Sequence, residues 1–319
     1  MNETLTLPTA DGPSSTTTLD HLSLLIARGP DARSFLDTQL TRNVPASASS
    51  LASPAGYCSP KGRLLASFVI WSDDDAVSLL VSRDIAEAIA KRLRMYVMRS
   101  KLTIEDATKV RVVDGLVDAE DLPASVAALA PWATTRIDDR VWIRFPDADG
   151  HRRDLRIAVD DNDEGDAVDS GFWRWLDVRA GLPWIVAATQ DRFVPQMLNL
   201  EALGGVDFKK GCFPGQEVVA RSQYLGKLKR RTALASAPAI DVVPAPGSDV
   251  WRPGDGEPCG LVVNAERGPD GGIAMLIELP LASFGAADLH AGSTDGPPLT
   301  TEALPYVLPD NEVFVRPRL

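Results

Sequence analysis

The sequence has only three cysteines and three histidines among 319 residues, and this scarcity excludes several kinds of site. Cys58, Cys212 and Cys259 are odd in number and widely spaced, which fits neither a disulfide framework nor a set of metal ligands. Four thiolates usually hold an iron–sulfur cluster, so we expect no stable metal. The histidines lie in no recognisable motif, so a Cys–His catalytic dyad is not expected. Free thiols of this kind favour a reducing, cytoplasmic location.

Long apolar runs are also missing from the sequence. No stretch approaches the roughly 18 apolar residues that a membrane-spanning helix needs, so no membrane partner is expected. Residues 1–18 are polar and rich in Ser and Thr, without the basic and apolar segments of a signal peptide. We expect them to form a flexible N-terminal tail.

Positive charge is in short supply overall. The chain has 33 Lys and Arg against 44 Asp and Glu, and its formal net charge is −11. This balance argues against a whole-protein attraction to nucleic acid or anionic membrane, so any anion binding must be local. Residues 208–231 are the exception, with seven Lys or Arg against one Glu. The basic tail 221–231 could be a solvated strand or a nucleic-acid patch, but a small polyanionic ligand fits the overall charge better.

The apolar pattern predicts an α+β fold with a separate β module. In residues 19–108 the expected order is strand–helix–strand–strand–helix–strand, which is the split β-α-β arrangement. Its strands are predicted at 22–27, 64–71, 76–81 and 101–105, and its helices at 31–40 and after a cap at Ser82. Residues 109–232 repeat this order more weakly, with strands at 110–117, 141–145 and 155–159 and helices at 122–129 and 170–180.

Residues 233–319 are expected to form a small β-barrel. Short apolar runs at 260–263, 273–279, 304–308 and 313–315 are separated by Gly and Pro. The acidic run 160–169, which precedes a helix in the second lobe, is interpreted as a solvated loop and not as a metal site, because it lacks the register of a calcium loop.

The segment KGCFPGQE, residues 210–217, is the first candidate for chemistry. Gly211 and Gly215 allow positive φ, and the following Val-Val-Ala is typical of a strand, so Cys212 is expected at the tip of a tight loop. The neighbouring Lys209 and Lys210 would favour the thiolate. A small hydrophobic cysteine in a structural turn is the alternative, and residue types alone do not decide.

Two further features allow more than one interpretation. Trp173 lies beside an apolar helical stripe, where a Trp is more often a core residue, although it could stack on a planar heterocycle. The turn Gly56–Arg63 carries two cations, and spacing alone does not say whether it is structural or binds an anion.

Several motifs together are specific. The strongest is the segment Phe193–Arg231 with its KGCFPGQE, supported by QLTRNV at 39–44, CSPKGR at 58–63, YVMRSK at 96–101 and AGLP at 180–183. On these residues the sequence resembles the YgfZ family of folate-binding proteins, which is related to the T-protein, the aminomethyltransferase of the glycine cleavage system. The resemblance spans roughly residues 19–232 and implies two ferredoxin-like lobes, at about 19–108 and 109–232, around a central folate-sized hole. A C-terminal β-barrel completes the implied fold.

The resemblance also implies a ligand and its contacts. Tetrahydrofolate or another folate is the expected bound cofactor, and Trp173 matches a family position associated with it. A second such position falls on Leu22, which supplies apolar contact but no aromatic stacking. The other expected cofactor-binding residues are Lys210, Gly211, Gln216, Glu217, Arg221 and Lys61, with Cys212 as the candidate functional thiol. The glutamate tail of folate would be attracted by Lys209, Lys210, Arg221 and the Lys227–Arg231 cluster. Cys212 would then lie near the mouth of the hole, and Cys58 could approach it.

The same resemblance bears on catalysis. T-proteins carry a catalytic aspartate shortly after a Gly-Gly turn, and alignment places Leu65 and Ala66 at that acidic pair. Neither side chain can handle a proton or a developing charge, so transfer chemistry is expected to be lost while folate binding remains. The implied role is transient support of iron–sulfur enzymes or assembly factors, and through them of tRNA thiolation. A folate-dependent one-carbon transferase or demethylase is the alternative, and direct tRNA binding through residues 227–231 is a third hypothesis.

Overall fold

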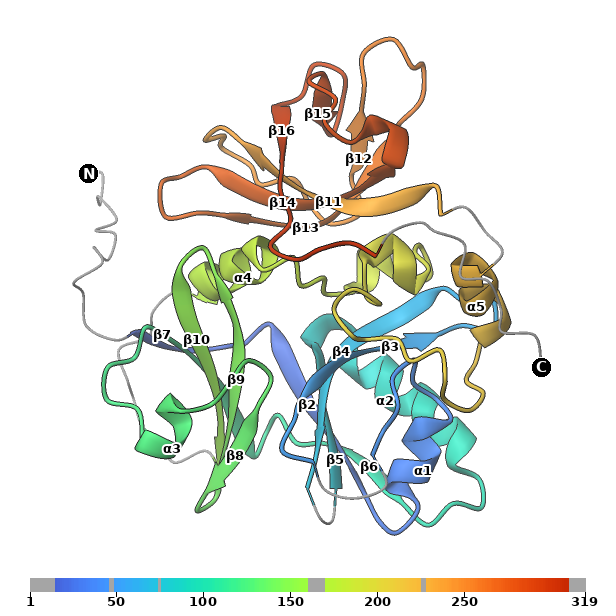
Figure 1. Cartoon of the computed structure of the whole chain (residues 1–319), viewed down its shortest axis with the longest axis vertical. Coiled ribbons are helices and arrows are strands. Elements are labelled where there is room, and N and C mark those ends of the chain that lie inside the picture. The colour runs from blue at the N-terminus through green and yellow to red at the C-terminus, as the bar shows by residue number, and fades with distance from the viewer. Residues whose placement is uncertain (1–14, 46–48, 74–75, 160–169, 225–227, 310–319) are drawn as a thin grey trace.

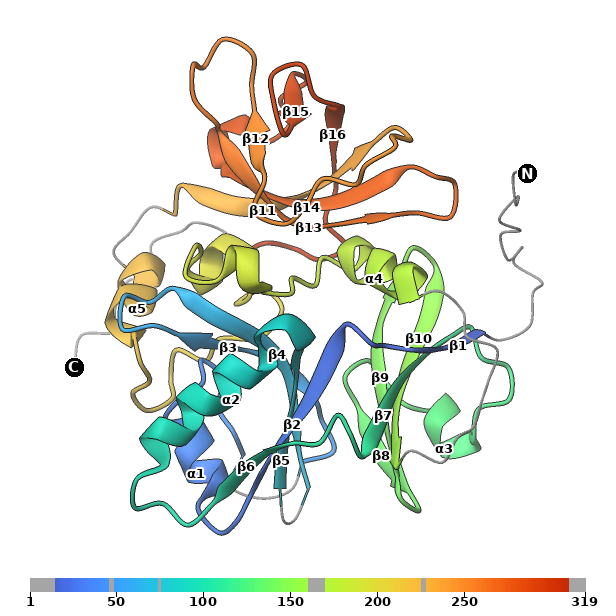
Figure 2. The same ribbon diagram turned by 180° about the vertical axis from the view of Figure 1, so that it is seen from behind.

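The structure is a computed structural model that describes residues 15–45, 49–73, 76–159, 170–224 and 228–309. Two five-stranded sheets lie next to each other, and a closed barrel sits above both of them (Figure 1). Seen from behind, helix α4 (Ser170–Arg179) lies between the mainly green sheet and the barrel, and helix α5 (Gln216–Tyr224) lies beside the outer edge of the mainly blue sheet (Figure 2). The predicted α+β fold with two lobes and a barrel is therefore confirmed.

Lobe 1 is an antiparallel sheet in the order β3-β4-β5-β2-β6 with two helices on one face. Its elements are β2 (Leu22–Arg28), α1 (Ala32–Asp37), β3 (Ser53–Cys58), β4 (Leu64–Ser72), β5 (Ala76–Ser82), α2 (Arg83–Val97) and β6 (Thr103–Asp106). Four of these strands follow the predicted split β-α-β order. The fifth, β3, was not predicted as a strand and runs into the predicted turn Gly56–Arg63, and it covers the free edge of β4.

Lobe 2 repeats the arrangement in the order β1-β7-β10-β9-β8. Its elements are β1 (Ser15–Thr18), β7 (Arg111–Val117), α3 (Ala124–Ala127), β8 (Thr134–Ile137), β9 (Arg140–Ala148), β10 (His151–Val159) and α4 (Ser170–Arg179). The predicted tail 1–18 is therefore too long, because Ser15–Thr18 pair with β7. This N-terminal strand takes the edge position that β6 takes in lobe 1, since the chain after α4 continues toward the barrel. Residues 1–14 and the acidic run 160–169 lie outside the described residues.

The barrel closes in the order β11-β14-β13-β12-β15-β16. Its strands are β11 (Arg230–Ala237), β12 (Asp249–Trp251), β13 (Gly260–Arg267), β14 (Ile273–Pro280), β15 (Leu289–Ala291) and β16 (Pro298–Glu302), with a short helical turn η3 (Leu281–Ser283). The sequence predicted a strand at residues 304–308, but these residues form no strand. They lead Tyr306 back onto the lobes, where its hydroxyl donates to the carbonyl of Gly181 at 3.1 Å. The predicted strand 313–315 lies outside the described residues.

The segment between α4 and the barrel contains two helical turns and one helix, η1 (Ala187–Thr189), η2 (Pro195–Leu198) and α5 (Gln216–Tyr224). One hydrophobic core runs through both lobes and reaches the outer wall of the barrel at Leu234, Val263 and Leu276. A smaller core fills the barrel itself. The three bodies therefore pack on shared apolar surface, and the space at their junction has a fixed shape.

Candidate functional site

A cavity of 520 Å³ lies where lobe 1, α4 and the barrel meet. We call it the junction cavity. Its apolar walls come from Val178, Leu182, Trp184, Pro246 and Ala265. Its polar end is built by strand pairing, because Leu22 stands opposite Ser82 and the backbone N–H of Arg83 donates to the carbonyl of His21 at 2.9 Å. His21, Ser82 and Arg83 thus reach one end of an otherwise apolar space.

The polar end carries buried atoms that lack hydrogen-bond partners among the described residues, although His21 Nδ1 lies 4.0 Å from the Asp20 carboxylate. The two ring nitrogens of His21 have no hydrogen-bond partner within the described residues, and the hydroxyl of Ser82 has none either. Ser82 was expected to cap α2, but it makes no side-chain capping bond and is only 4 % exposed. Buried polar groups are normally bonded, so these atoms suit a ligand that brings its own donors and acceptors.

Burial also sets the charge of His21. It lowers the pKa of the imidazole, the nearby Arg174 guanidinium adds to this effect and the Asp20 carboxylate opposes it, and together they bring the pKa from 6.5 to about 4. The ring is therefore neutral at physiological pH and offers one donor and one acceptor. An exposed Arg83 stands beside it at the rim.

The carboxylates that line the junction cavity already have partners. Asp84 accepts from the backbone N–H of Ala187 at 2.8 Å, and Glu266 pairs with Arg174. Asp177 accepts from Arg153 at 2.7 Å and from the indole of Trp184 at 2.9 Å. None of the three carboxylates is available as an unengaged base.

Leu22 and Trp173 flank this cavity without lining it. Leu22 follows His21 and is 1 % exposed, and Trp173 precedes Arg174 and is fully buried. The Trp173 ring lies 5.5 Å from that of Phe145 and 5.2 Å from the Arg153 guanidinium. A Cβ at Gly115 would stand 2.4 Å from the indole, so only glycine fits there. Trp173 is a core residue, as its residue type alone predicts, and a ligand could touch it only if its neighbours moved.

Lys210 holds the KGCFPGQE loop to lobe 1. Its side chain is 1 % exposed, and its Nζ donates to the carbonyls of Asp37, Leu40 at 2.8 Å and Arg42 at 3.3 Å. Burial lowers the pKa of this amine, and the Asp37 carboxylate opposes the effect. The ammonium is thus occupied by backbone carbonyls, and no donor is left for a folate carboxylate.

Two glycines join this loop to the turn at 58–63. Gly62 and Gly215 have φ of +72° and +76°, and a Cβ on Gly215 would lie 2.4 Å from the Ser59 carbonyl oxygen. The turn is therefore structural on this side. Lys61 lies within this turn, and its ammonium makes no hydrogen bond or ion pair with another described residue.

The two cysteines of these segments lie in different environments. Cys58 is buried, which raises its pKa to about 12, whereas Cys212 is exposed. Gly211 has open space around its Cα, and Gln216 Nε2 lies 3.5 Å from its carbonyl oxygen. The loop itself thus leaves the Cys212 thiol open to the outside.

Cys212 borders a groove of 680 Å³ that also contains Gln216, Glu217, Arg221 and Tyr224. Residues 218–220, expected to form a strand, belong to α5, whose only buried residue is Val219. The helix lies beside β3, and β4 and β5 separate β3 from β2 (Figure 1). Three strand spacings, roughly 14 Å, therefore separate this region from Leu22. The structure brings four predicted site residues together here, away from the junction cavity.

Two arginines of the basic tail are used inside the fold, while Arg221 and Lys229 are exposed. Arg230 binds both oxygens of Glu278, and Arg231 is 4 % exposed with its Nη1 2.7 Å from Glu201. Both were expected to attract the folate tail, but they anchor β11. Lys227 lies outside the described residues.

The positions compared with a catalytic acid lie in β4. Ala66 is fully buried, and Leu65 accepts a hydrogen bond through its carbonyl from Gln190 at 2.7 Å. In the described part of the chain no three His, Cys, Asp or Glu side chains are grouped so that they could hold a metal ion. Of the helices described, none has the length and apolar character to cross a membrane.

Sequence reasoning missed the residues at the polar end of the junction cavity. His21 has no motif, and Ser82 has the signature of a helix cap. Both are recognisable only once the pairing of β2 with β5 and the position of the barrel are known.

Comparison with known proteins gives a family and a fold. No family model matches the chain. A tRNA-modifying protein YgfZ from Edwardsiella ictaluri is 31% identical over 90% of this chain and 94% of its own. One from Klebsiella pneumoniae is 31% identical over 93% and 94%, and one from Escherichia coli is 28% identical over 94% and 96%. Among solved structures, the glycine cleavage system aminomethyltransferase T from Bartonella henselae superposes with a TM-score of 0.66 over 92% of this chain and 86% of its own. At 14% identity this last likeness concerns the fold alone.

Proposed function

The chain belongs to the YgfZ family, and from this membership we propose that it binds tetrahydrofolate or another folate in the junction cavity. One observation carries the proposal. His21 and Ser82 present buried polar atoms, without a hydrogen-bond partner among the described residues, to a cavity whose remaining walls are mostly apolar. A pterin has two apolar faces and an edge of alternating donors and acceptors, which is the complement of such a site.

Size and charge support the same ligand. The 520 Å³ cavity falls within the range of about 300–1,000 Å³ typical of small-molecule sites. The pterin would occupy the enclosed part, with the neutral His21 and Ser82 bonding its edge. The glutamate carboxylate of the folate would lie at the cavity entrance beside Arg83, whose exposed guanidinium suits an anion. The bound folate would supply the capacity to carry a one-carbon unit.

Calorimetric titration with 5-formyltetrahydrofolate tests this assignment. His21→Leu keeps the bulk and removes both ring nitrogens, so we expect affinity to fall by about 1–2 kcal/mol, or roughly five- to thirtyfold. Ala265→Phe fills the cavity from β13 and should abolish binding. His151→Leu is the matched control, because that ring pairs with Asp118 on lobe 2 at 2.6 Å. The proposal would be contradicted if the wild-type protein showed no saturable binding of 5-formyltetrahydrofolate, or if His21→Leu bound it as tightly as the wild type.

We further propose that the protein supports iron–sulfur proteins, and through them tRNA thiolation, without aminomethyl transfer of its own. The paired carboxylates of the cavity and the apolar Leu65 and Ala66 of β4 favour binding over transfer chemistry. Cys212 stands in an exposed groove remote from the cavity, which favours contact with a client protein over contact with the folate carbon.

A deletion strain tests this second part. Loss of the gene should lower iron–sulfur enzyme activity and the thiolated fraction of tRNA, and plasmid-borne wild type should restore both. We expect Cys212→Ala to restore neither, while Cys259→Ala, a barrel cysteine that is half-buried, restores both. Full rescue by Cys212→Ala would show that the thiol is dispensable.

A further inference from the structure

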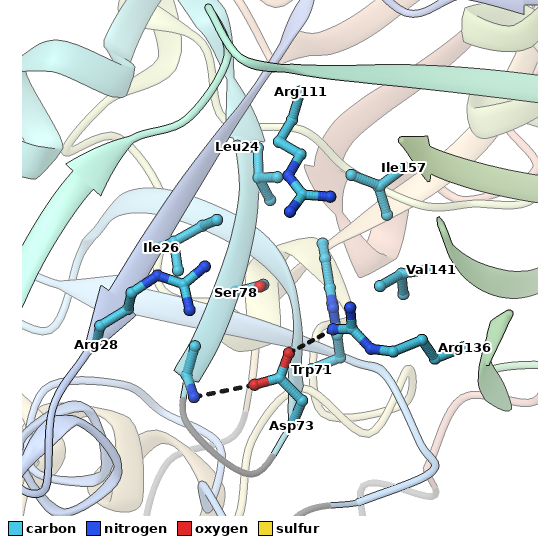
Figure 3. Close-up of a pocket in the computed structure, with 11 residues that line it drawn as sticks. Leu24, Ile26, Arg28, Trp71, Asp73, Ser78, Arg111, Arg136, Val141 and Ile157 are labelled. Atoms are coloured by element: carbon cyan, nitrogen blue, oxygen red, sulfur yellow. Dashed lines mark hydrogen bonds and ion pairs between the residues drawn. The ribbon is translucent and has the colours of Figure 1, made fainter. Parts of the chain in front are cut away.

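A second cleft, of 330 Å³, lies between the two lobes and is lined by residues of both sheets (Figure 3). We call it the inter-lobe cleft. The ends of the two sheets that carry it lie away from the barrel (Figure 1). None of the described residues that line it also lines the junction cavity. Its apolar floor is made by Leu24 and Ile26 of β2 and by Val141 and Ile157 of lobe 2. Nothing in the proposed folate site uses this space.

Positive charge gathers around that floor. Arg28 comes from lobe 1, and Arg111 and Arg136 come from lobe 2, and Figure 3 shows their guanidinium groups around the same space. Asp73 is the one carboxylate among the described lining residues. Among the described lining residues, three cations against one anion leave an excess of two positive charges, in a chain whose net charge is −11.

The partners of these cations are unevenly distributed. Arg136 Nη2 pairs with Asp73 Oδ2 at 2.7 Å, which links the two lobes and uses the carboxylate. Within the described residues, the guanidinium of Arg111 donates one hydrogen bond, to the backbone carbonyl of Asp139 at 3.1 Å. The guanidinium of Arg28, which is exposed, has no hydrogen bond or ion pair within the described part of the chain. Within the described residues, two guanidinium groups therefore have no carboxylate partner.

We propose that the inter-lobe cleft binds an organic anion. Its carboxylate or phosphate group would be held between Arg28 and Arg111, since guanidinium forks bind both groups through paired hydrogen bonds. A short aromatic or apolar body would rest on Leu24, Ile26, Val141 and Ile157. The volume lies near the lower end for small-molecule sites, which suits a ligand of one ring. Because the two arginines belong to different lobes, such a ligand bridges them as the Asp73–Arg136 pair does.

Three probes that share a phenyl ring test the proposal on the full-length chain. Phenylacetate carries a carboxylate, phenyl phosphate carries a phosphate, and 2-phenylethanol is neutral. We expect one or both anions to give saturable binding by calorimetry and to raise the thermal midpoint, with 2-phenylethanol at least about tenfold weaker. The stronger of the two anions identifies the source of the negative group.

Arginine variants locate the binding. Arg28→Gln and Arg111→Gln should each weaken the preferred anion by about ten- to a hundredfold, as expected for a lost hydrogen bond to a charged group. Arg252→Gln is the matched control, because that side chain is 41% exposed and pairs with Asp288 in the barrel. His21→Leu should leave anion binding unchanged, which separates this site from the folate site. Midpoints without ligand establish that each variant is folded.

Three outcomes would overturn the proposal. The first is that neither anion saturates the wild-type protein. The second is that 2-phenylethanol binds as well as the anions, which would leave an apolar hollow without anion recognition. The third is wild-type affinity in both Arg28→Gln and Arg111→Gln.

Discussion

Burial inside the junction cavity gives His21 a chemistry that its sequence context does not announce. Its pKa of about 4 lies below the ordinary 6.5 because the imidazolium is desolvated and faces Arg174. In the unfolded chain the same ring regains the ordinary value. The unfolded state therefore binds more protons than the folded state between these two pH values, and folding stability falls as the pH falls through that window.

This shift predicts a measurable pH dependence. Between pH 7 and pH 5 the wild-type free energy of unfolding should lose about 2 kcal/mol more than that of His21→Leu, which has no proton to gain. Denaturant unfolding of both proteins at the two pH values measures the difference. Parallel profiles for the two proteins would show that His21 is not buried in neutral form.

The cationic residues show where prediction from residue type stopped. Lys210, Arg230 and Arg231 were expected to meet a folate tail, and each instead neutralises or bonds a group of its own chain. A sequence shows how many charges a segment has, but it does not show which carboxylate or carbonyl the fold will bring to each one. Trp173 takes the core position that its residue type favours, whereas the folate contact that the resemblance implies for it stays a prediction.

At the scale of elements, long periodic segments were predictable and short or mixed ones were not. The strands β2, β4, β5, β7 and β14 follow apolar runs that the sequence displays openly. The strand β3 contains Pro54 and Gly56, which are typical of turns, and it forms because β4 offers an edge. The helix α5 begins with Gln-Glu-Val-Val-Ala, and its surface position with one buried residue overrides the strand preference of the two valines.

The contact between the KGCFPGQE loop and the turn at 58–63 yields a prediction at this scale. Gly215→Ala should destabilise the protein by about 1–3 kcal/mol more than Gly204→Ala. Both glycines have positive φ, so both variants carry the same backbone penalty, but only at Gly215 does a Cβ meet backbone, 2.4 Å from the Ser59 carbonyl oxygen, while Gly204 has open space. Chemical denaturation of the two variants measures this, and equal losses would mean that the loop does not rest on the turn.

At the scale of the whole molecule, both clefts arise between bodies that the sequence could only place in order along the chain. The junction cavity takes residues from the turn before β2, the join of β5 and α2, α4 and the barrel, and the inter-lobe cleft takes them from both sheets. No spacing motif links such segments. The resemblance to a folate-binding family predicted a central hole. The residues at the polar end of the junction cavity could be identified only from the packing of the two lobes and the barrel.

The most direct test of the folate assignment is the crystal structure of the chain with 5-formyltetrahydrofolate bound. We expect the pterin to lie between α4 and the barrel, with its polar edge against His21 and Ser82. Density for the ligand in the groove beside α5 or between the lobes, with the junction cavity empty, would contradict it.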